Sequence, residues 1–363
     1  MTRALGWAVG ACVALSVSAC GSAGEDDRRG ATGGSGGLAG AGGGGGGGAG
    51  GAAGGGAGGA GGGASSGGGG GAGGGAAGAG GGACNGDPSY CDRPYDQVAV
   101  VCTHNAMSSV EDPGFDVPTP NQQYSFERQL DDGVRCMMLD TYLDQGAVNL
   151  CHAACFLGAT PWVPMLQRLR AWMDAHPREV VTFILEANID TAQTRQSLVD
   201  GGVWELVYHH DRPPGSAWPT LRSLIASGTR LVMLTDDDAG GDDWYLDWRR
   251  YGWETPYNDA TFTCDPGRGD PTRYDHQLFI LNHYTLCPAG GCASNGEVNN
   301  EFDFLWEHAA RCWQADSQRN PWGHIPTFVN LDHYEVPIAG GGTQRADAFD
   351  VADALNAAWP EPP

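Results

Sequence analysis

The sequence predicts an α/β domain whose parallel strands close into a TIM-type (β/α) barrel, and two observations favour this fold class. First, apolar runs rich in β-branched residues alternate with amphipathic stretches throughout residues 84–363. Such alternation is typical of βα units, whose strands pair in parallel. Second, the first apolar run continues into Thr103-His104-Asn105-Ala106, whereas a doubly wound open sheet usually carries a glycine-rich turn there. The open sheet is the alternative, and the barrel is the more economical closure.

The individual elements follow from hydrophobic periodicity and from capping residues. Seven short apolar runs are expected to be strands, at residues 97–103, 134–142, 147–151, 180–185, 230–235, 278–282 and 327–331. Six amphipathic stretches are expected to be helices, at residues 125–131, 162–176, 191–208, 221–226, 299–315 and 346–359. Pro161 and Pro219 lie where helices should begin, and Gly133 and Gly228 lie where helices should end, as capping chemistry favours.

The first 83 residues have a different composition, because 35 of the 60 glycines lie in residues 30–83. A Gly/Ala segment has nothing apolar enough to repay the entropy of ordering. We therefore expect a disordered linker at 20–83 and a folded domain at 84–363.

Residues 1–19 are typical of a secretory signal, with Arg3 ahead of an apolar run too short to span a bilayer. The run ends in Val17-Ser18-Ala19-Cys20, which resembles a bacterial lipobox, so we expect cleavage before Cys20 and lipidation of that cysteine. An ordinary signal peptide is the alternative. We expect a lipid-anchored protein of the cell envelope facing the periplasm or exterior, or a secreted protein if Cys20 is not lipidated.

Basic residues exclude several functions. All 20 are arginine, so neither a P-loop hydrolase that uses its motif lysine nor a pyridoxal enzyme with a lysine Schiff base is possible. The net charge is −23, and no arginine run exceeds two residues. Phosphate backbones require basic clusters, so nucleic acid is not an expected partner. We expect a monomer.

Cysteine usage agrees with export. Ten cysteines follow Cys20, an even number that favours disulfides over a metal site in an oxidising compartment. Cys84 and Cys91 are close enough in sequence to suggest a local loop, as are Cys151 and Cys155.

Polar residues follow the apolar runs at the places where active sites of α/β barrels are built. They are His104, Asn105, Asp140, His152 and Glu186. Two imidazoles can act as base and acid in one displacement, because each titrates near neutral pH. The two carboxylates and the amide oxygen are ligands suited to Ca²⁺ or Mg²⁺. A cation beside two histidines fits phosphodiester cleavage, in which negative charge grows on phosphorus oxygens. Residues 84–363 contain no Gly-x-Ser-x-Gly motif, so a serine hydrolase is not supported.

These residues belong to segments that resemble the phosphatidylinositol-specific phospholipase C X-domain superfamily, in its secreted single-domain branch. The segments are Cys84-Asn85-Gly86, Thr103-His104-Asn105, Gln129-Leu130-Asp131-Asp132-Gly133-Val134-Arg135, Met138-Leu139-Asp140, Leu150-Cys151-His152, Pro177-Arg178-Glu179-Val180-Val181-Thr182, Trp218-Pro219-Thr220-Leu221, Leu281-Asn282-His283-Tyr284 and Val329-Asn330. Their order and spacing together are specific, and the resemblance covers nearly all of 84–359.

The resemblance implies a phospholipase C-like phosphodiesterase barrel in which a neighbouring substrate hydroxyl attacks the phosphodiester. His104 matches the histidine that serves as base or stabilises the pentavalent phosphorus. His152 matches the histidine that protonates the leaving oxygen. Asn105, Asp140 and Glu186 match ligands of the Ca²⁺-dependent members, with Mg²⁺ as a second possibility. Metal-independent bacterial members carry arginine where Asp140 stands, so the aspartate favours metal dependence.

The chain departs from this pattern at two places. Met138 stands at a position that is acidic in the calcium-dependent eukaryotic enzymes. Asp236-Asp237-Asp238 follows a predicted strand where binders of inositol phosphates tend to carry basic residues, so multiply phosphorylated inositol lipids are poor candidates. The acidic run is interpreted either as a solvated loop or as a second cation site.

The sequence therefore predicts an exported phosphoric diester hydrolase or lyase that cleaves a phospholipid head group or a related phosphodiester and contacts a membrane surface through lipidated Cys20. One alternative is a glycerophosphodiesterase or sphingomyelinase D-like enzyme, which usually has a Glu-x-Asp pair where Met138-Leu139-Asp140 stands. The other is a lipid-binding surface module that has lost turnover.

Overall fold

The computed structural model describes residues 82–363 except 113, 116–119, 153, 237–241, 258–259, 286–292 and 339–344. All of the described residues belong to one compact unit, Gly73–Pro363. The predicted signal peptide, Cys20 and the linker up to residue 81 lie outside the described residues, as do Asp237, Asp238, Cys287 and Cys292.

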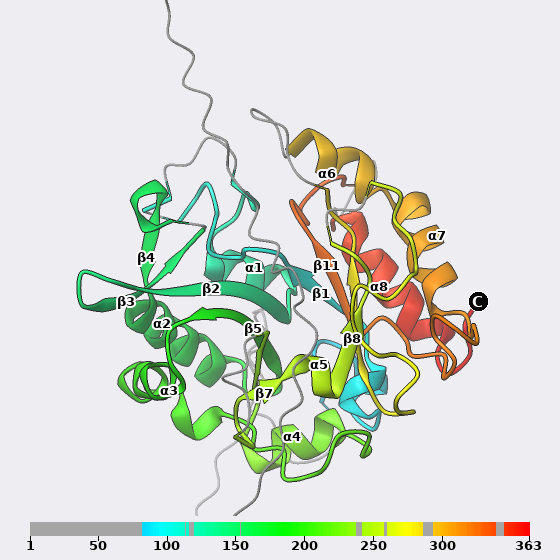
Figure 1. Ribbon diagram of the computed structural model, residues 1–363, viewed down its shortest axis with the longest axis horizontal. Helices are drawn as coiled ribbons and strands as arrows, with labels where there is room; N and C mark the ends of the chain where they lie inside the picture. Colours follow the sequence, from blue (N-terminus) through cyan, green and yellow to red (C-terminus); the bar gives the residue numbers. More distant parts are fainter. Residues whose placement is uncertain are drawn as a thin grey trace, which may run out of the picture. The chain divides into compact units, whose positions relative to one another are not determined.

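One curled, mostly parallel sheet forms the centre of this unit (Figure 1). Its strands are β1 (Val100–Thr103), β2 (Cys136–Asp144), β3 (Ala147–Cys151), β4 (Ala159–Pro161), β5 (Val181–Asn188), β6 (Leu231–Thr235), β7 (Leu246–Asp247), β8 (Gly252–Glu254), β9 (Arg268–Gly269), β10 (Leu278–Asn282) and β11 (Phe328–Leu331). Their order is β7-β6-β5-β2-β1-β11-β10-β8-β9, with β3 paired to β2 and β4 paired to β3.

Helices cover the outer face of the sheet. They are α1 (Phe126–Asp132), α2 (Trp162–Ala175), α3 (Thr191–Asp200), α4 (Leu221–Ser227), α5 (Trp248–Tyr251), α6 (Ala293–Asn299), α7 (Phe302–Trp313) and α8 (Asp347–Ala358). Gly133 and Gly228 end α1 and α4 in the left-handed conformation, with φ of 116° and 80°, which glycine adopts without a steric penalty. These two caps confirm the expectation from the sequence.

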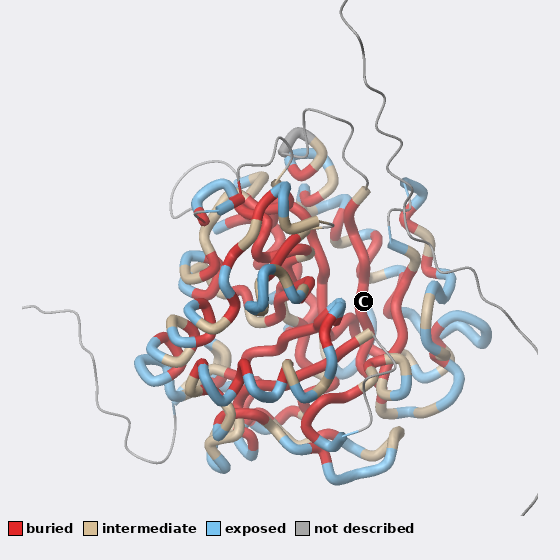
Figure 2. Tube along the Cα trace, turned by 60° about the vertical axis from the view of Figure 1, so that its left-hand side comes forward, coloured by how far each residue is buried: buried red, intermediate tan, exposed pale blue. Residues whose placement is uncertain are grey.

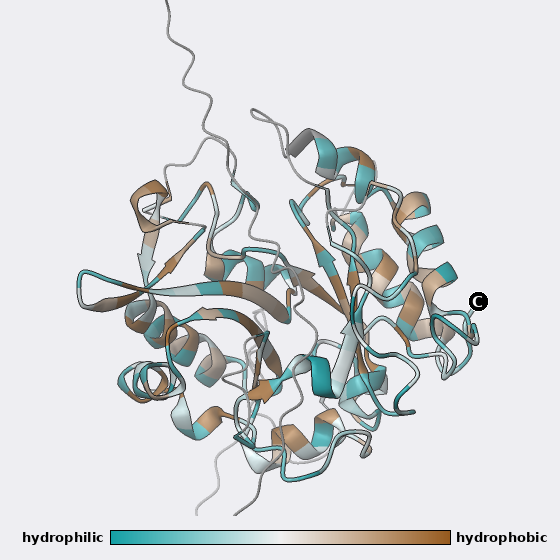
Figure 3. Cartoon of the chain, viewed as in Figure 1, coloured by the Kyte–Doolittle hydropathy of each residue, from teal (hydrophilic) through white to brown (hydrophobic). Residues whose placement is uncertain are grey.

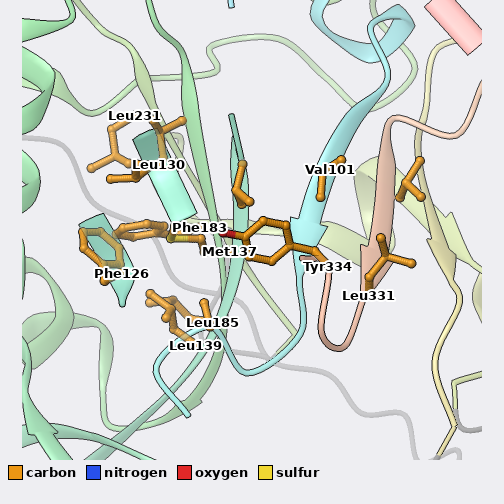
Figure 4. Close-up of a cluster of buried hydrophobic side chains, with 14 of the residues drawn as sticks. Val101, Phe126, Leu130, Met137, Leu139, Phe183, Leu185, Leu231, Leu331 and Tyr334 are labelled. Carbon is orange, nitrogen blue, oxygen red and sulfur yellow. The ribbon is translucent and has the colours of Figure 1, made fainter. Parts of the chain in front are cut away.

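Alternation along the strands separates two cores, since successive side chains point to opposite faces. One cluster fills the inside of the curl and includes Cys102, Cys136, Ile184, Leu234, Ile280 and Phe328. The other packs the sheet against the helices and includes Val101, Met137, Leu139, Phe183, Leu185 and Leu331, part of which Figure 4 shows together with Phe126 and Tyr334. Buried residues accordingly run through the strands (Figure 2), and the helices alternate polar and apolar residues (Figure 3).

The fold class is α/β as expected, but three details of the prediction were wrong. Among the described residues the strands form an open ladder that runs from β7 to β9 and does not close into a full barrel. Residues 147–151 pair antiparallel with β2 as the second arm of a hairpin, where a parallel strand was expected. The predicted helix at 191–208 is not continuous, because α3 ends at Asp200 before Gly201-Gly202. Glycine has a low helix propensity, which explains the break. The helix predicted at 299–315 is present as α7, whereas α6 before it was not predicted.

Four disulfides lie within the described residues: Cys84–Cys91, Cys102–Cys136, Cys151–Cys155 and Cys264–Cys312. The first and third confirm the local pairs that the sequence suggested. Cys264, Cys312 and His308 lie close enough together to hold a metal ion. Both sulfurs are bonded to each other in the disulfide, however, so they cannot act as thiolate ligands. Within the described part of the chain, no helix combines the length and the apolar character needed to cross a membrane.

Candidate active site

The site lies toward the carboxyl ends of the central parallel strands, where inward-pointing residues of neighbouring strands are paired in register. Asp140 on β2 pairs in register with Glu186 on β5. His104 follows β1, and its backbone N–H donates to the Leu331 carbonyl at 2.9 Å. This edge brings together side chains that are up to 228 residues apart in sequence.

His104 is held by an aspartate that follows β11. Its Nδ1 lies 2.9 Å from Asp332 Oδ1, and Asp332 is buried. The same carboxylate oxygen accepts a bond from Asn121 Nδ2 at 3.0 Å. The imidazole also stacks on the Tyr284 ring, with centroids 4.0 Å apart. Because a carboxylate only accepts, the Nδ1 of His104 carries a proton and Nε2 of the neutral ring is an acceptor.

His152 reaches the site from the β2–β3 hairpin. The turn Gln145-Gly146 sends β3 back along β2, and His152 comes directly after β3. Burial, followed by the nearby His104, lowers the pKa of His152, while Asp332 opposes this shift. The antiparallel hairpin therefore delivers the second imidazole to the edge where parallel strands deliver the other groups.

Asn105 joins both histidines to Asp140. Its backbone adopts a left-handed conformation, with φ of 47°, which asparagine tolerates better than most residues. The amide nitrogen lies 3.2 Å from His104 Nε2 and 3.3 Å from His152 Nε2. The amide oxygen lies 3.2 and 3.3 Å from the two carboxylate oxygens of Asp140.

Two orientations of this amide have different chemical requirements. Swapping oxygen and nitrogen would let the amide donate to Asp140 and accept from both imidazoles, but His104 would then need protons on both nitrogens. In the orientation described above, the amide donates to the lone pair of neutral His104. Its oxygen then faces Asp140 with no donor between them, so this orientation requires a cation or a proton there, whereas in the swapped orientation the amide itself donates to Asp140. The donor set of one amide oxygen and carboxylate oxygens suits a hard divalent cation.

The carboxylates at this edge repel one another. Burial raises the pKa of Asp140 well above its usual range, and Glu186 and Asp236 raise it further. Asp236 follows β6, and burial raises its pKa to about 6, with a further contribution from Glu186 and an opposing one from Arg268. Bringing like charges together in this way is typical of functional sites.

Met138 lies on β2 two residues before Asp140, so it points to the same inner face one layer deeper. It is partly buried against the inner core cluster. Its sulfur lies 3.2 Å from Asn330 Nδ2, and Asn330 donates in turn to Asn282 Oδ1 at 2.8 Å. A thioether is a soft ligand, so this position contributes no hard oxygen to a cation.

A guanidinium beside the carboxylates was not identified from the sequence. Arg268 on β9 bonds Glu254 through Nε, and its NH1 lies 3.3 Å from Asp236 Oδ2. Glu254 is buried and accepts from Asn282 Nδ2 at 3.0 Å. Since β9 has only two residues, no periodicity marked Arg268.

Asp332 and Tyr284 were also missed as site residues. Asp332 follows the last predicted strand, so the rule that found Asp140 and Glu186 could have found it. Tyr284 could not be found in this way, because its contribution is a ring stacked on His104. All five residues predicted from the sequence lie at this edge, and distances or strand register connect each of them to the others.

A profile of the family described as PI-PLC X matches residues 90–347. An uncharacterized secreted protein of Arthroderma benhamiae is 27% identical over 75% of this chain and 63% of its own length. A PI-PLC X domain-containing protein 1 from the same organism is 33% identical over 55% of this chain and 67% of its own. One from Arabidopsis thaliana is 26% identical over 72% and 62%, respectively. The chain thus spans about two thirds of these relatives or less.

Solved structures resemble the fold distantly. A mutant of the phosphatidylinositol-specific phospholipase C of Staphylococcus aureus aligns with a TM-score of 0.46 and 11% identity, covering 73% of this chain and 93% of that one. A second mutant gives 0.44 and 12%, over 73% and 94%. The family match extends over most of the chain and includes all five predicted site residues. The chain belongs to the PI-PLC X family.

Proposed function

We propose that this protein is an exported phosphodiesterase that cleaves the head-group phosphodiester of a phospholipid by acid/base chemistry of two histidines assisted by a divalent cation. The observation that carries the proposal is the Asn105 amide, which contacts His104 and His152 on one side and Asp140 on the other. Few purely structural networks would place two imidazoles and a set of repelling carboxylates around one amide at the carboxyl ends of parallel strands.

The geometry supports distinct roles for the two histidines. Asp332 holds the proton on His104 Nδ1, so the lone pair is on Nε2, where it can accept a proton from an attacking hydroxyl in place of the bond from Asn105. His152 has a lowered pKa, so its protonated form is a strong acid that can give its proton to the leaving oxygen. The substrate's own hydroxyl attacks phosphorus, the bond to the leaving oxygen breaks, and the product keeps a cyclic phosphate.

A bound Ca²⁺ or Mg²⁺ would neutralise negative charge that develops on the phosphorus oxygens. Asn105, Asp140 and Glu186 would hold it. Metal-independent members of the family that this chain resembles carry an arginine at the position of Asp140. Because this chain has an aspartate there, a cation is the expected source of positive charge.

Exposed apolar side chains in the segments after the strands support a lipid substrate. The phenyl ring of Phe156 is 88% exposed, and further large exposed apolar residues lie in segments that follow β1, β3, β8, β10 and β11, among them Val110, Leu157, Tyr257, Val298 and Ile338. The turn with Phe156 is closed by the Cys151–Cys155 disulfide and is brown beside β4 in Figure 3. Given the charge of −23, a zwitterionic lipid surface is the expected partner.

Four disulfides and a relative named as secreted are consistent with an extracellular location. Anchoring through lipidated Cys20 is part of the proposal. It predicts that the full chain incorporates labelled palmitate when expressed in a bacterium, and that Cys20→Ala does not.

The function is tested by incubating the full chain with phosphatidylinositol vesicles, with Ca²⁺ or with EGTA, and following the products by phosphorus NMR. A cyclic phosphate that forms only with Ca²⁺ is expected. Glycerol phosphate as product would instead favour the glycerophosphodiesterase alternative. Calcium-dependent lipid binding without any product from a panel of phosphodiester lipids would favour a binding module and contradict the proposal.

A further inference from the structure

His333 directly follows Asp332, the residue that holds His104, and both of its ring nitrogens face groups that accept hydrogen bonds. Its Nδ1 lies 2.9 Å from Glu335 Oε1, and its Nε2 lies 2.9 Å from the Pro120 carbonyl oxygen. A neutral imidazole carries one proton and can donate to only one of these oxygens, whereas an imidazolium donates to both. The two contacts therefore call for a doubly protonated ring.

The surroundings of the ring favour this charge although the ring is buried. The side chain of His333 is only 3% exposed, and burial alone lowers its pKa. The hydrogen bond to Glu335, the negative charges of Glu335 and Asp332 and the Pro120 carbonyl outweigh burial, so the pKa of His333 is raised above its ordinary value. The charged groups that act on the ring are thus both acids, as a buried cation requires.

The backbone of His333 is held in an uncommon conformation. Its φ is 50°, in the left-handed region that costs free energy for a residue with a side chain. The His333 N–H donates to the Asn121 carbonyl at 2.8 Å, and Asn300 Nδ2 donates to the carbonyls of Asp332 and His333 at 2.9 Å each. Gly296 of α6 packs close by, where a Cβ would lie 2.8 Å from the His333 Cβ. Strain that several neighbours maintain in this way is a feature of functional positions.

Three consecutive residues connect this ring to the site. The first is Pro120, whose carbonyl accepts from the imidazolium. The second is Asn121, whose Nδ2 donates to Asp332 Oδ1 at 3.0 Å. The third is Gln122, whose Nε2 donates to the His104 carbonyl at 2.8 Å. A movement of the first residue would therefore be felt by the carboxylate and by the imidazole that it orients.

We propose that His333 is a positioning residue of the site, whose buried imidazolium ties residues 120–122 to Glu335. The tie keeps the Asn121 amide on the carboxylate that orients His104. This inference rests on the proposed role of His104 as base, and it adds a buried charge that acts on the base through its neighbours.

Two substitutions in the full chain separate the two bonds of the ring. The side-chain nitrogen of asparagine can take the place of Nδ1, so His333→Asn keeps a donor to Glu335 and loses the bond to Pro120. The side-chain nitrogen of glutamine can take the place of Nε2, so His333→Gln keeps a donor to Pro120.

The rates of phosphatidylinositol cleavage should follow the bond to Pro120. His333→Asn should lower kcat about 10- to 100-fold with little change in KM, since a misplacement of about 1 Å can cost about 100-fold. His333→Gln should lie between this variant and the wild type. Because asparagine tolerates a positive φ better than glutamine does, a purely conformational role would produce the opposite order and overturn the inference. His209→Asn is the matched control, because His209 bonds Asp243 at the surface, and it should leave kcat unchanged.

NMR of ¹⁵N-labelled histidine gives two measurements that need no turnover. Near pH 7 both ring nitrogens of His333 should carry protons. The Nδ1 proton of His104 should exchange with solvent about tenfold faster in His333→Asn than in the wild type, as expected when one net hydrogen bond is lost.

These measurements separate the inference from the function on which it rests. A neutral His333 near pH 7, or unchanged kcat and unchanged proton exchange in His333→Asn, would overturn the inference and leave the proposed function intact. If the wild type cleaves no phosphodiester but the exchange of the His104 proton still responds to His333→Asn, the proposed function is wrong and the positioning role stands. Near-ultraviolet circular dichroism identifies a variant that has failed to fold, and the charge of His333 in the wild type then remains the decisive measurement.

Discussion

The bond between His104 and Asp332 allows a quantitative test of how the site is positioned, through the substitution Asp332→Asn. The change keeps the shape of the side chain but removes a charge that accepts from His104 Nδ1 at 2.9 Å and from Asn121 Nδ2 at 3.0 Å. Asp332 is 7% exposed, so water compensates little for the loss.

The expected magnitude follows from the strength of such bonds. Hydrogen bonds to charged groups contribute about 1.5–3 kcal/mol, and each 1.4 kcal/mol is about a factor of ten in rate. Asp332→Asn should therefore lower kcat/KM about 10- to 150-fold. An amide at this position can also turn its NH₂ toward Nδ1, which would shift the proton of His104 to Nε2 and prevent that nitrogen from accepting a proton.

Two assays measure this. Phosphorus NMR of phosphatidylinositol cleavage gives the rate, and ¹⁵N chemical shifts of labelled histidine give the tautomer of His104 independently of any activity. Asp132→Asn is the matched control: Asp132 accepts from Tyr334 Oη at 2.8 Å outside the site, and the variant should retain wild-type activity. The reasoning would be refuted if Asp332→Asn kept its rate within twofold and its His104 tautomer unchanged.

Three further predictions concern lipid contact, disulfides and pH. Phe156→Ser should weaken binding to phosphatidylcholine vesicles about 10- to 100-fold, because burying such a side chain contributes about 1.5–3 kcal/mol. Vesicle sedimentation measures this binding, and equal binding by the variant and the wild type would contradict the lipid-contact role. Replacing Cys264 and Cys312 with alanine should lower the unfolding free energy by about 3–4 kcal/mol, because the bond joins residues 48 apart; urea titration yielding under 1 kcal/mol would count against this estimate. Burial lowers the pKa of His324 to about 4, and its neutral ring accepts from Trp253 Nε1 and donates to the Tyr274 carbonyl. The pKa of His324 is about 6.5 in the unfolded chain, so the lower pKa in the folded chain stabilises the fold above about pH 6.5, and this contribution is lost as the pH falls toward 4. Between pH 7 and pH 5, the free energy of unfolding should therefore fall by about 2 kcal/mol less in His324→Gln than in the wild type.

The sequence determined the class of the fold and the five residues first assigned to the site. Runs such as 278–282 coincide with strands, and Gly133 and Gly228 end helices as predicted, because periodicity and capping are local properties of the chain. His104, Asp140 and Glu186 were recognised because polar residues are unusual where an apolar run ends and because the carboxyl ends of parallel strands share an edge.

Only the tertiary structure decided which residues act on one another. The direction of β3 depends on the turn at Gln145-Gly146 and on pairing with β2, and the pattern of its five residues is the same in either direction. The bond between His104 and Asp332 joins positions 228 residues apart. Asp236 lies beside Glu186 because of the strand register, which depends on how separate strands align in the sheet. Local chemistry along the chain thus supplied the candidates, whereas long-range pairing fixed their distances and charges.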